Sequence, residues 1–469
     1  MVWNFSNYLE ATALCDDKGN TLTYRQLEEE GVKLFEVIRK RCLVLILCKN
    51  EIGSVMGYVS FINNKIVPML VSSYIENESF LNLLNLYKPS YVWMPKSELY
   101  RFNYNSYIYC SCDYVLVKTN YKKDYDIYEE LGLLLTTSGS TGSPKFVRQS
   151  YTNILDNALS IVQYLQLNCD EKPITTLPMN YTYGLSIINS HLLVGAKILL
   201  TNKSITQIEF WDFFKLFGAT SFGGVPYTYE MLDKMKFQKM NIPSLKTMTQ
   251  AGGKLTLDLH EKLARYAYET EKKFVVMYGQ CEATARMGYL PANKAIEKKG
   301  SMGIAIPGGK FRLIDLEGKE IITPYTTGEL VYEGKNVSLG YAEREKDLCK
   351  KDERKGILVT GDMAQFDEDG YYYIVGRKKR FLKIFGNRIN LDEIEQLIKS
   401  RFGVECASAG IDDHMYIFLL DDSISDQVKN FLSLKTRINQ VAFVVKCIKK
   451  IPKNEAGKIL YNNLVKYYD

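Results

Sequence analysis

A short polar segment at residues 137–145 has the composition of a phosphate-binding loop. It follows an apolar run, and its candidate anion ligands are Thr137, Ser138, Gly139, Ser140, Thr141, Gly142 and Lys145. Glycine lets the backbone approach an anion closely, hydroxyl groups donate hydrogen bonds, and the lysine adds a mobile positive charge. We therefore predict that this loop binds the phosphates of a nucleotide. The alternative is an ordinary surface turn rich in Gly, Ser and Thr.

The spacing of this loop differs from that of a Walker phosphate loop. A Walker loop needs Gly and Lys side by side and a helix after them. Here Ser143 and Pro144 separate Gly142 from Lys145, and Phe146 follows. Because Pro144 has no backbone N–H and disfavours a helix start through Lys145, we expect the loop to connect two strands.

The segments around this loop alternate between strand and helix patterns. Strand-like runs occur at 43–47, 108–117, 131–136 and 197–201, and helical spacing of apolar residues occurs near 27–38 and 154–165. Such alternation predicts an α/β fold with a large layered N-terminal domain of several subdomains.

The chain changes character near the basic run at 377–380. A helix capped by Asn390 and ended by Gly403 follows, then strands at 415–420 and 441–447 with a helix between them. We therefore predict an N-terminal domain over 1–377 and a small, mobile α+β C-terminal domain over 378–469.

Composition narrows the class of protein. The 469 residues are 46% hydrophobic and 24% charged, with a formal net charge of +6, which is typical of a globular protein and gives no indication of nucleic-acid binding. We see no signal peptide and no apolar run of membrane-spanning length. The ten cysteines include no Cys-x-x-Cys pair, and the three histidines are far apart. We expect a reduced, cytoplasmic protein without structural zinc.

Six segments together resemble the AMP-forming adenylating superfamily, which includes acyl-CoA synthetases, nonribosomal peptide adenylation domains and firefly luciferase. They occur in that family's order: the loop 137–145; Gly252, Gly253 and Lys254; Tyr278, Gly279, Gln280, Cys281 and Glu282; Asp362 after Thr360-Gly361; Arg377 with Gly386; and Lys458 at the end of Pro452–Lys458. The resemblance covers nearly the whole chain and is closest in pattern to acyl and aryl ligases.

The resemblance implies a role for each charged residue. Lys145 and the loop hydroxyls would bind the β and γ phosphates of ATP, and Glu282 would be a ligand of Mg²⁺. Asp362 would accept hydrogen bonds from the ribose, with Arg377 nearby. Lys458 would reach the reacting carboxylate from the small domain, and Lys379 stands at the hinge position. Lys145, Glu282 and Lys458 are the candidate catalytic residues.

The acid-binding pocket is predicted from two further segments. Its candidate lining residues are Tyr181, Gly184, Phe222, Gly223, Gly224 and Val225, with Gly279 beside them. Tyr181 stands where relatives usually have histidine. Amino-acid-activating relatives have an aspartate in this region, and residues 177–185 contain none, so an amino acid substrate is disfavoured.

The expected activity is a ligase reaction in two steps. A carboxylate and ATP give an acyl-adenylate and pyrophosphate, and a thiol then gives a thioester and AMP. The acceptor is coenzyme A or the phosphopantetheine of an acyl carrier protein, with Gly386 beside that arm. Cys281 replaces the usual threonine. Alternatives are an amino-acid-activating enzyme, a catalytically silent nucleotide-binding protein and a kinase-like phosphotransferase, and the acid itself stays open.

Overall fold

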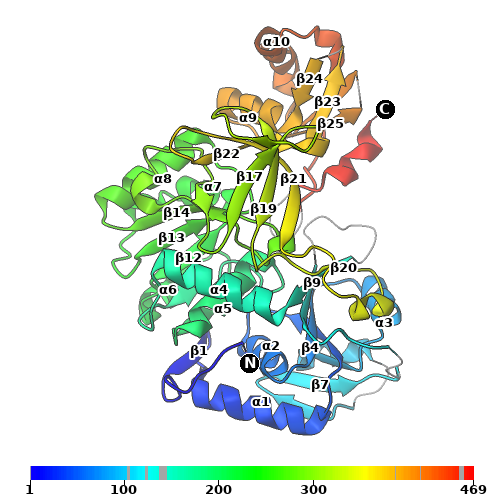
Figure 1. The fold of residues 1–469 in the computed structure, drawn as a ribbon. Coiled ribbons are helices and arrows are strands. Elements are labelled where there is room, and N and C mark those ends of the chain that lie inside the picture. Colours follow the sequence, from blue (N-terminus) through cyan, green and yellow to red (C-terminus); the bar gives the residue numbers. More distant parts are fainter. Residues whose placement is uncertain are drawn as a thin grey trace.

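The computed structural model describes residues 2–102, 106–121, 125–136, 145–385, 387–411, 413–453 and 459–468. Figure 1 shows two large sheets with their helices, a third sheet between them and the C-terminal end, and a smaller unit that holds the C-terminus. Within the described residues, no helix is both long and apolar enough to cross a membrane.

An eight-stranded mixed sheet contains the strands on both sides of the predicted phosphate loop. Its order is β20 (Gly340–Ala342), β9 (Phe146–Ser150), β8 (Leu131–Thr136), β4 (Val67–Ser72), β3 (Leu43–Cys48), β5 (Tyr91–Pro95), β7 (Tyr114–Lys118) and β6 (Tyr109–Ser111). Strands β8 and β9 are antiparallel neighbours, with Thr136 opposite Phe146. The loop therefore connects strand to strand, as its proline predicts, and β20 brings residue 341 next to its end.

A nine-stranded sheet places two further motifs, the glycine pair after Ala251 and the segment from Tyr278 to Glu282, at one edge. Its order is β16 (Ile304–Ala305), β15 (Gly288–Tyr289), β14 (Lys273–Tyr278), β13 (Thr247–Gln250), β12 (Ser221–Gly224), β10 (Pro173–Ile174), β11 (Ile198–Leu200), β1 (Thr12–Asp16) and β2 (Thr21–Thr23). Strands β12, β13 and β14 run parallel. Their carboxyl ends consequently meet at one edge, where ligands of open α/β sheets usually bind.

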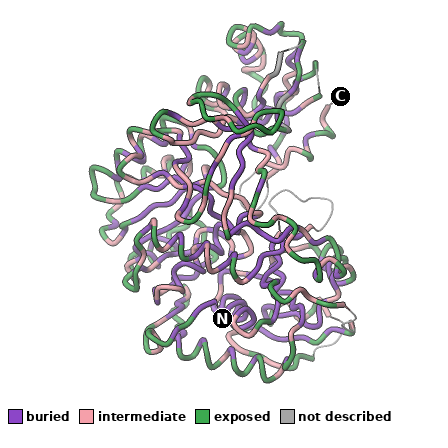
Figure 2. Tube along the Cα trace, viewed as in Figure 1, coloured by how far each residue is buried: buried purple, intermediate pink, exposed green. Residues whose placement is uncertain are grey.

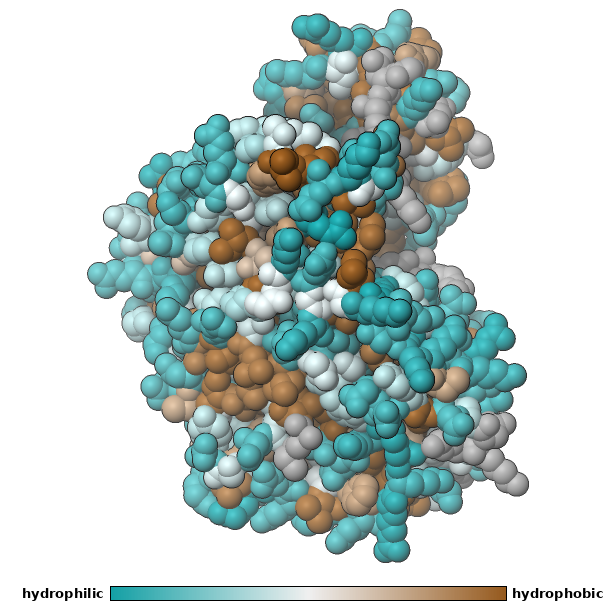
Figure 3. All heavy atoms as spheres, in the orientation of Figure 1, coloured by the Kyte–Doolittle hydropathy of each residue, from teal (hydrophilic) through white to brown (hydrophobic). Residues whose placement is uncertain are grey.

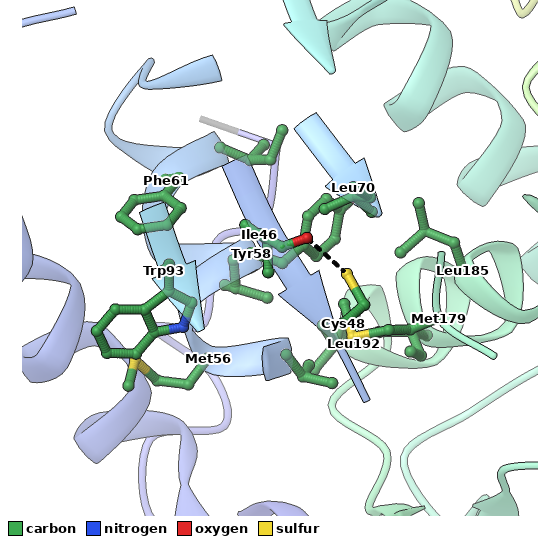
Figure 4. Close-up of a cluster of buried hydrophobic side chains, with 14 of the residues drawn as sticks. Ile46, Cys48, Met56, Tyr58, Phe61, Leu70, Trp93, Met179, Leu185 and Leu192 are labelled. Carbon is green, nitrogen blue, oxygen red and sulfur yellow. Dashed lines mark hydrogen bonds between the residues drawn. The ribbon is translucent and has the colours of Figure 1, made fainter. Parts of the chain in front are cut away.

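Helices fill the space between these two sheets and cover their outer faces. Helices α1 (Tyr24–Ile38), α2 (Ile52–Asn63), α4 (Tyr151–Leu165) and α5 (Thr182–Leu193) share one hydrophobic core with both sheets. Helix α3 (Asn77–Tyr87) covers the eight-stranded sheet, and α6 (Ile208–Phe217), α7 (Pro226–Lys234) and α8 (Leu257–Glu269) cover the nine-stranded sheet. Figure 4 shows part of the shared core, where side chains of α2 and α5 pack against β3, β4 and β5.

Helix α2 is apolar around nearly its whole circumference because it lies inside this layer. Every residue from Ile52 to Ile62 is buried. A Cβ atom at Gly57 would lie 2.2 Å from Nε1 of Trp93, so only glycine permits this approach of helix to strand.

A five-stranded antiparallel sheet follows the two large sheets. Its order is β18 (Glu320–Ile321), β17 (Lys310–Ile314), β19 (Gly328–Glu333), β21 (Ile357–Phe366) and β22 (Tyr372–Arg377). Its last pair of strands sets Asp362 directly opposite Arg377. Two of the predicted nucleotide ligands are therefore cross-strand neighbours at the place where the chain leaves for the C-terminal unit.

The C-terminal unit has its own hydrophobic core. It contains the hairpin β23 (Phe381–Ile384) and β24 (Asn387–Asn390), helices α9 (Leu391–Phe402) and α10 (Ser425–Thr436), and the sheet β25 (Cys406–Ile411), β26 (His414–Leu419) and β27 (Phe443–Cys447). Asn390 caps α9 and Gly403 ends it in a left-handed conformation, as predicted. In Figure 2 the buried residues of this unit are separate from those of the large sheets.

The predicted class, a layered α/β domain with a smaller α+β unit, is confirmed, while the boundary between 377 and 378 remains a prediction. The strand-like run at 108–117 is instead a hairpin of β6 and β7, because Cys112 and Asp113 have positive φ angles and reverse the chain. Val441 lies in a 3-10 turn before β27.

Figure 3 shows a mostly hydrophilic face with a hydrophobic region over the part where α4 and α5 lie.

Candidate functional site

The phosphate-loop residues Thr137, Ser138, Gly139, Ser140, Thr141 and Gly142 lie outside the described residues, and their predicted role stays a prediction. Lys145 is described, immediately before β9. Its ammonium nitrogen lies 3.7 Å from the centre of the Tyr341 ring. A lysine over a tyrosine ring is held by a cation–π interaction, so the last residue of the loop is fixed against β20.

Tyr341 also contacts Glu282, the predicted magnesium ligand. The Tyr341 hydroxyl donates to Oε1 of Glu282 at 2.8 Å. Glu282 lies in the 3-10 turn η3 (Cys281–Ala283), directly after β14 and the Gly279-Gln280 link. Burial, and then the Glu282 carboxylate, raise the pKa of Tyr341 to about 12, so the hydroxyl is a donor at neutral pH. One tyrosine thus joins Lys145 and Glu282, which are far apart in sequence.

Arg354 completes this group. Its guanidinium lies 4.6 Å from the centre of the Tyr341 ring and donates to the backbone oxygen of Glu282 at 3.2 Å. A cavity of about 550 Å³ is lined by Gln280, Glu282, Tyr341, Glu353, Arg354 and residues 357–360. A second cavity of about 490 Å³ is lined by Lys145, residues 340–341, Glu343, Arg344, Asp347, Lys350, Glu353 and Arg354. The two cavities share Tyr341, Glu353 and Arg354, and the second also has the cations Lys145, Arg344 and Lys350 beside the carboxylates of Glu343 and Asp347. Cations of this kind can bind phosphate groups.

The predicted ribose ligand Asp362 is buried and well coordinated. The Tyr278 hydroxyl donates to its Oδ2 at 2.5 Å, and the Gln280 amide donates to the same oxygen at 2.8 Å. Arg377 Nε lies 3.6 Å from its Oδ1. Burial and the Asp362 carboxylate raise the pKa of Tyr278 well above its usual range, so it too stays a donor. These donors hold the carboxylate in one orientation.

The glycine pair after β13 requires glycine at its first position. Gly252 has a φ of +84°, and a Cβ atom there would lie 2.8 Å from the Tyr181 hydroxyl oxygen. A Cβ atom at Gly253 would meet the ring of Pro226 at 3.0 Å. Lys254 donates through Nζ to the backbone oxygen of Ile374 at 3.1 Å. The structure therefore connects Lys254 to β22, and its predicted contact with the nucleotide is untested.

The six pocket candidates do not share one surface. Along β12 and its end, side chains alternate between the two faces of the sheet. Val225 packs in the cluster that also contains Tyr181 and Tyr183, whereas Phe222 packs with α6 and α7 on the opposite face. A Cβ atom at Gly223 would meet Ile187 and Tyr183, whereas one at Gly224 would meet Tyr229 and Thr228. The contiguous prediction over 222–225 thus mixes both faces, and Phe222 belongs to the outer core.

Gly184 and Gly279 allow close backbone packing. A Cβ atom at Gly184 would lie 2.4 Å from the backbone oxygen of Pro178, and one at Gly279 would lie 1.5 Å from that of Ala285. Cys281 is buried and donates through Sγ to the backbone oxygen of Thr136 at 3.2 Å, at the point where β8 ends. The thiol thus holds the turn of Glu282 against the start of the phosphate loop.

Comparisons with known proteins agree with this arrangement. Residues 117–342 match the family described as AMP-binding enzyme. The chain is 27% identical over 357 residues to the peroxisomal OPC-8:0-CoA ligase 1 of Arabidopsis thaliana, covering 72% of this chain and 64% of that protein. It is 26% identical to a 2-succinylbenzoate–CoA ligase of Bacillus cereus, covering 73% of this chain and 72% of the relative.

Solved structures show the same fold. The o-succinylbenzoate CoA synthetase of Bacillus subtilis, in complex with its acyl-adenylate intermediate, superimposes with a TM-score of 0.77 at 20% identity, covering 97% of this chain and 95% of that one. The anthranilate CoA ligase AuaEII, in complex with anthranoyl-AMP, gives a TM-score of 0.79 at 18% identity, covering 99% and 96%. Over residues 117–342 this chain is thus similar to the AMP-binding enzymes, and its fold is the one seen in these CoA ligases.

The C-terminal unit contacts helix α7, which covers the nine-stranded sheet. Lys458 and Gly386 lie outside the described residues, as does the Lys379 side chain. The residues flanking the Lys458 segment are described, and Lys453 and Ile459 form an antiparallel bridge. The Lys453 ammonium lies 4.7 Å from the centre of the Tyr227 ring on α7, two residues after Val225. The base of this segment is therefore anchored near the predicted pocket.

Tyr341 and Arg354 were not identified from the sequence. The chain contains 34 tyrosines, and nothing in the composition around residue 341 distinguishes this one. The signal that could have found it is the pairing of β20 with β9, which places Tyr341 opposite Val147 and close to Lys145. That pairing joins segments nearly two hundred residues apart, which sequence periodicity alone does not predict.

Proposed function

We propose that this chain is an AMP-forming ligase that activates a carboxylic acid with ATP and transfers the acyl group to a thiol. The proposal rests chiefly on one observation: Gln280 and Glu282 lie in the same turn and line one cavity. Gln280 donates a hydrogen bond to Asp362, and Glu282 accepts one from Tyr341. Its similarity to proteins named as CoA ligases supports it. The chain spans 64% of the length of the first of these relatives, and the activity is therefore our proposal.

In the first step, an oxygen of the acid's carboxylate attacks the α-phosphorus of ATP. The bond from that phosphorus to the bridging oxygen breaks, and pyrophosphate leaves with the electron pair. Negative charge grows on the leaving group, and fixed cations stabilise it. Lys145 and the 137–144 loop would face the departing phosphates, and Lys458 would face the reacting carboxylate. Asp362 would hold the ribose, and the Gly252-Gly253 turn would lie beside adenine.

The residues around Glu282 fit a magnesium ion. A carboxylate oxygen is a ligand that Mg²⁺ prefers. Of the two carboxylate oxygens of Glu282, only Oε1 accepts a hydrogen bond from the described residues. Oε2 is then the oxygen that would hold the ion, which would offset phosphate charge when bound. Tyr341 would orient the carboxylate, because its hydroxyl fixes the other oxygen.

In the second step, a thiol sulfur attacks the acyl carbon, and AMP leaves with the oxygen that came from the carboxylate. We propose that residues 378–469 rotate about Lys379 between the steps, so that Lys458 leaves and Gly386 admits the phosphopantetheine arm. The acceptor is coenzyme A. An acyl carrier protein, which presents the same arm, is the second acceptor to test.

The test is acid-dependent exchange of labelled pyrophosphate into ATP, measured over a panel of carboxylic acids. We expect exchange with at least one acid, and a loss of about 100-fold or more in Lys458→Ala. Lys449→Ala, an exposed lysine of the same unit, is the matched control and should keep full exchange. No exchange with any acid by the folded wild type, or equal exchange by Lys458→Ala, contradicts the proposal. Transfer is then compared with coenzyme A and a loaded carrier protein.

A further inference from the structure

Arg286 is a buried cation beside the predicted acid pocket. Its side chain is 2% exposed. Nε donates to the Ser186 hydroxyl at 3.1 Å, Nη1 contacts the sulfur of Met277, and the guanidinium carbon lies 4.2 Å from the centre of the Tyr183 ring. No Asp or Glu among the described residues lies within ion-pair distance of it. The contacts that Arg286 makes within the protein are therefore all with neutral groups.

Arg148 shows how this chain otherwise satisfies a buried arginine. It is equally enclosed, yet it donates to the backbone oxygens of Tyr341, Leu339, Lys350 and Lys351 and forms an ion pair with Glu353. Burying a charge without an opposite charge is costly unless its hydrogen bonds are replaced. The Ser186 hydroxyl, the Met277 sulfur and the hydroxyls of Tyr164 and Tyr183 are neutral partners of Arg286, and none supplies the counter-charge that Glu353 gives Arg148. What the Arg286 guanidinium lacks among the described residues is an anionic partner.

The backbone before Arg286 is strained. Thr284 and Ala285 have φ angles of +54° and +105°, although neither is glycine. The Ala285 carbonyl packs against Gly279, where a Cβ atom would lie 1.5 Å away. Such conformations cost free energy and persist where the surroundings impose them, commonly at functional sites. This turn separates Glu282, which faces Tyr341 and Lys145, from Arg286, which faces Tyr183.

Arg286 lies beside residues that are predicted to line the acid-binding pocket. Met277 and Tyr183, which it contacts, belong to one cluster with Val225 and Ala251, and Tyr181 packs at its edge. The Tyr181 hydroxyl lies next to Gly252. An acid that displaces Tyr181 would therefore have its reacting carboxylate near Gly252 and its far end near Arg286.

We propose that Arg286 determines specificity by binding a second carboxylate at the far end of the substrate, which makes the substrate a dicarboxylic acid. This inference rests on the proposed ligase function. A carboxylate matches the planar guanidinium with two parallel hydrogen bonds and supplies the counter-charge that the protein does not. Tyr183 and Met277 would then pack against the apolar part of the acid.

The test compares wild-type pyrophosphate exchange with matched acids: dicarboxylic acids of increasing length, and for each the acid with a methyl or a primary alcohol in place of the far carboxylate. We expect one dicarboxylic acid to have a kcat/KM about tenfold or more above both analogues. Equal or better use of an analogue overturns this inference and leaves the ligase proposal intact. No exchange with any acid contradicts both.

Two substitutions assign the preference to Arg286. Arg286→Gln should lose the preference mainly through KM, and Arg286→Lys should keep part of it because the charge remains. Binding of ATP, followed by thermal shift, checks that each variant is folded, and Arg265→Gln on the surface of α8 is the control. A preference unchanged in Arg286→Gln contradicts the assignment. If that variant does not fold, the comparison of acids with the wild type still decides.

Discussion

The hydroxyl of Tyr341 lies 2.8 Å from a carboxylate oxygen of Glu282, and the Lys145 ammonium lies 3.7 Å from the centre of the same tyrosine ring. The three residues come from β20, the turn after β14 and the end of the phosphate loop. Tyr341 therefore couples the predicted magnesium ligand to the predicted pyrophosphate-binding lysine, although it would touch neither the acid nor the α-phosphorus itself. In the proposed reaction it would be a positioning residue.

Replacing Tyr341 with phenylalanine tests this role. The substitution removes the hydrogen bond to Glu282 but keeps the ring beneath Lys145 and Arg354. A hydrogen bond to a charged group contributes about 1.5–3 kcal/mol, so we expect roughly 10-fold weaker pyrophosphate exchange, together with a higher Mg²⁺ concentration for half-maximal rate. Tyr325→Phe, at an exposed position, is the control. An unchanged Mg²⁺ dependence in Tyr341→Phe would show that the hydroxyl does not position Glu282.

Replacing Tyr227 with alanine tests whether the Lys453 contact belongs to the adenylation step. The substitution removes the ring that the Lys453 ammonium approaches. A partly exposed cation–π pair contributes about 0.5–1 kcal/mol, so we expect pyrophosphate exchange to fall by about 2- to 5-fold. Thioester formation from supplied acyl-adenylate should not fall, because the proposed rotation would have moved the small domain by then. Tyr268→Ala on α8 is the exposed control. A larger loss in thioester formation than in exchange would place this contact in the other step.

His191 gives a prediction for stability against pH. It is buried in α5, and desolvation lowers its pKa to about 4 from 6.5. Between these values the unfolded chain binds the proton and the folded chain does not, so stability falls as pH falls from about 6.5 toward about 4. The full loss from this one group is about 3 kcal/mol.

The variant His191→Gln should lower Tm at neutral pH and show a smaller further decrease in Tm between pH 6.5 and pH 4.5 than the wild type. His414→Gln, at an exposed position, should follow the wild-type slope. Parallel decreases in Tm for wild type and His191→Gln would contradict the assignment to His191.

The elements of the fold were largely predictable where local patterns decide them. Residues close in sequence decide the apolar run of β3. They also decide where α9 begins, at the cap Asn390, and where it ends, at Gly403. The run at 108–117 was less predictable, because its hairpin depends on left-handed conformations at Cys112 and Asp113. Neither residue is glycine, so the sequence gives no sign of a turn there. Sequence periodicity cannot distinguish one strand from two short ones joined by such a turn.

The candidate site was predictable as a set of motifs but not as a geometry. The resemblance indicated Glu282 and Asp362, whereas Tyr341 depends on the pairing of β20 with β9. The prediction for 222–225 treated neighbours in sequence as neighbours in space, and the alternation of β12 turns Phe222 away from Val225. Arg286 stood out only through its burial, which depends on packing among distant segments.

In the proposed reaction the acid's carboxylate attacks the α-phosphorus of ATP. The most direct measurement is the transfer of ¹⁸O from the acid to the nucleotide product. The acid is labelled with ¹⁸O in its carboxylate and incubated with the enzyme, ATP and coenzyme A. The nucleotide product is then analysed by mass spectrometry. We predict AMP with one ¹⁸O atom for each thioester formed, because that oxygen stays on phosphorus when the thiol displaces AMP. Formation of ADP with the label in inorganic phosphate, or of AMP without label, would contradict the account.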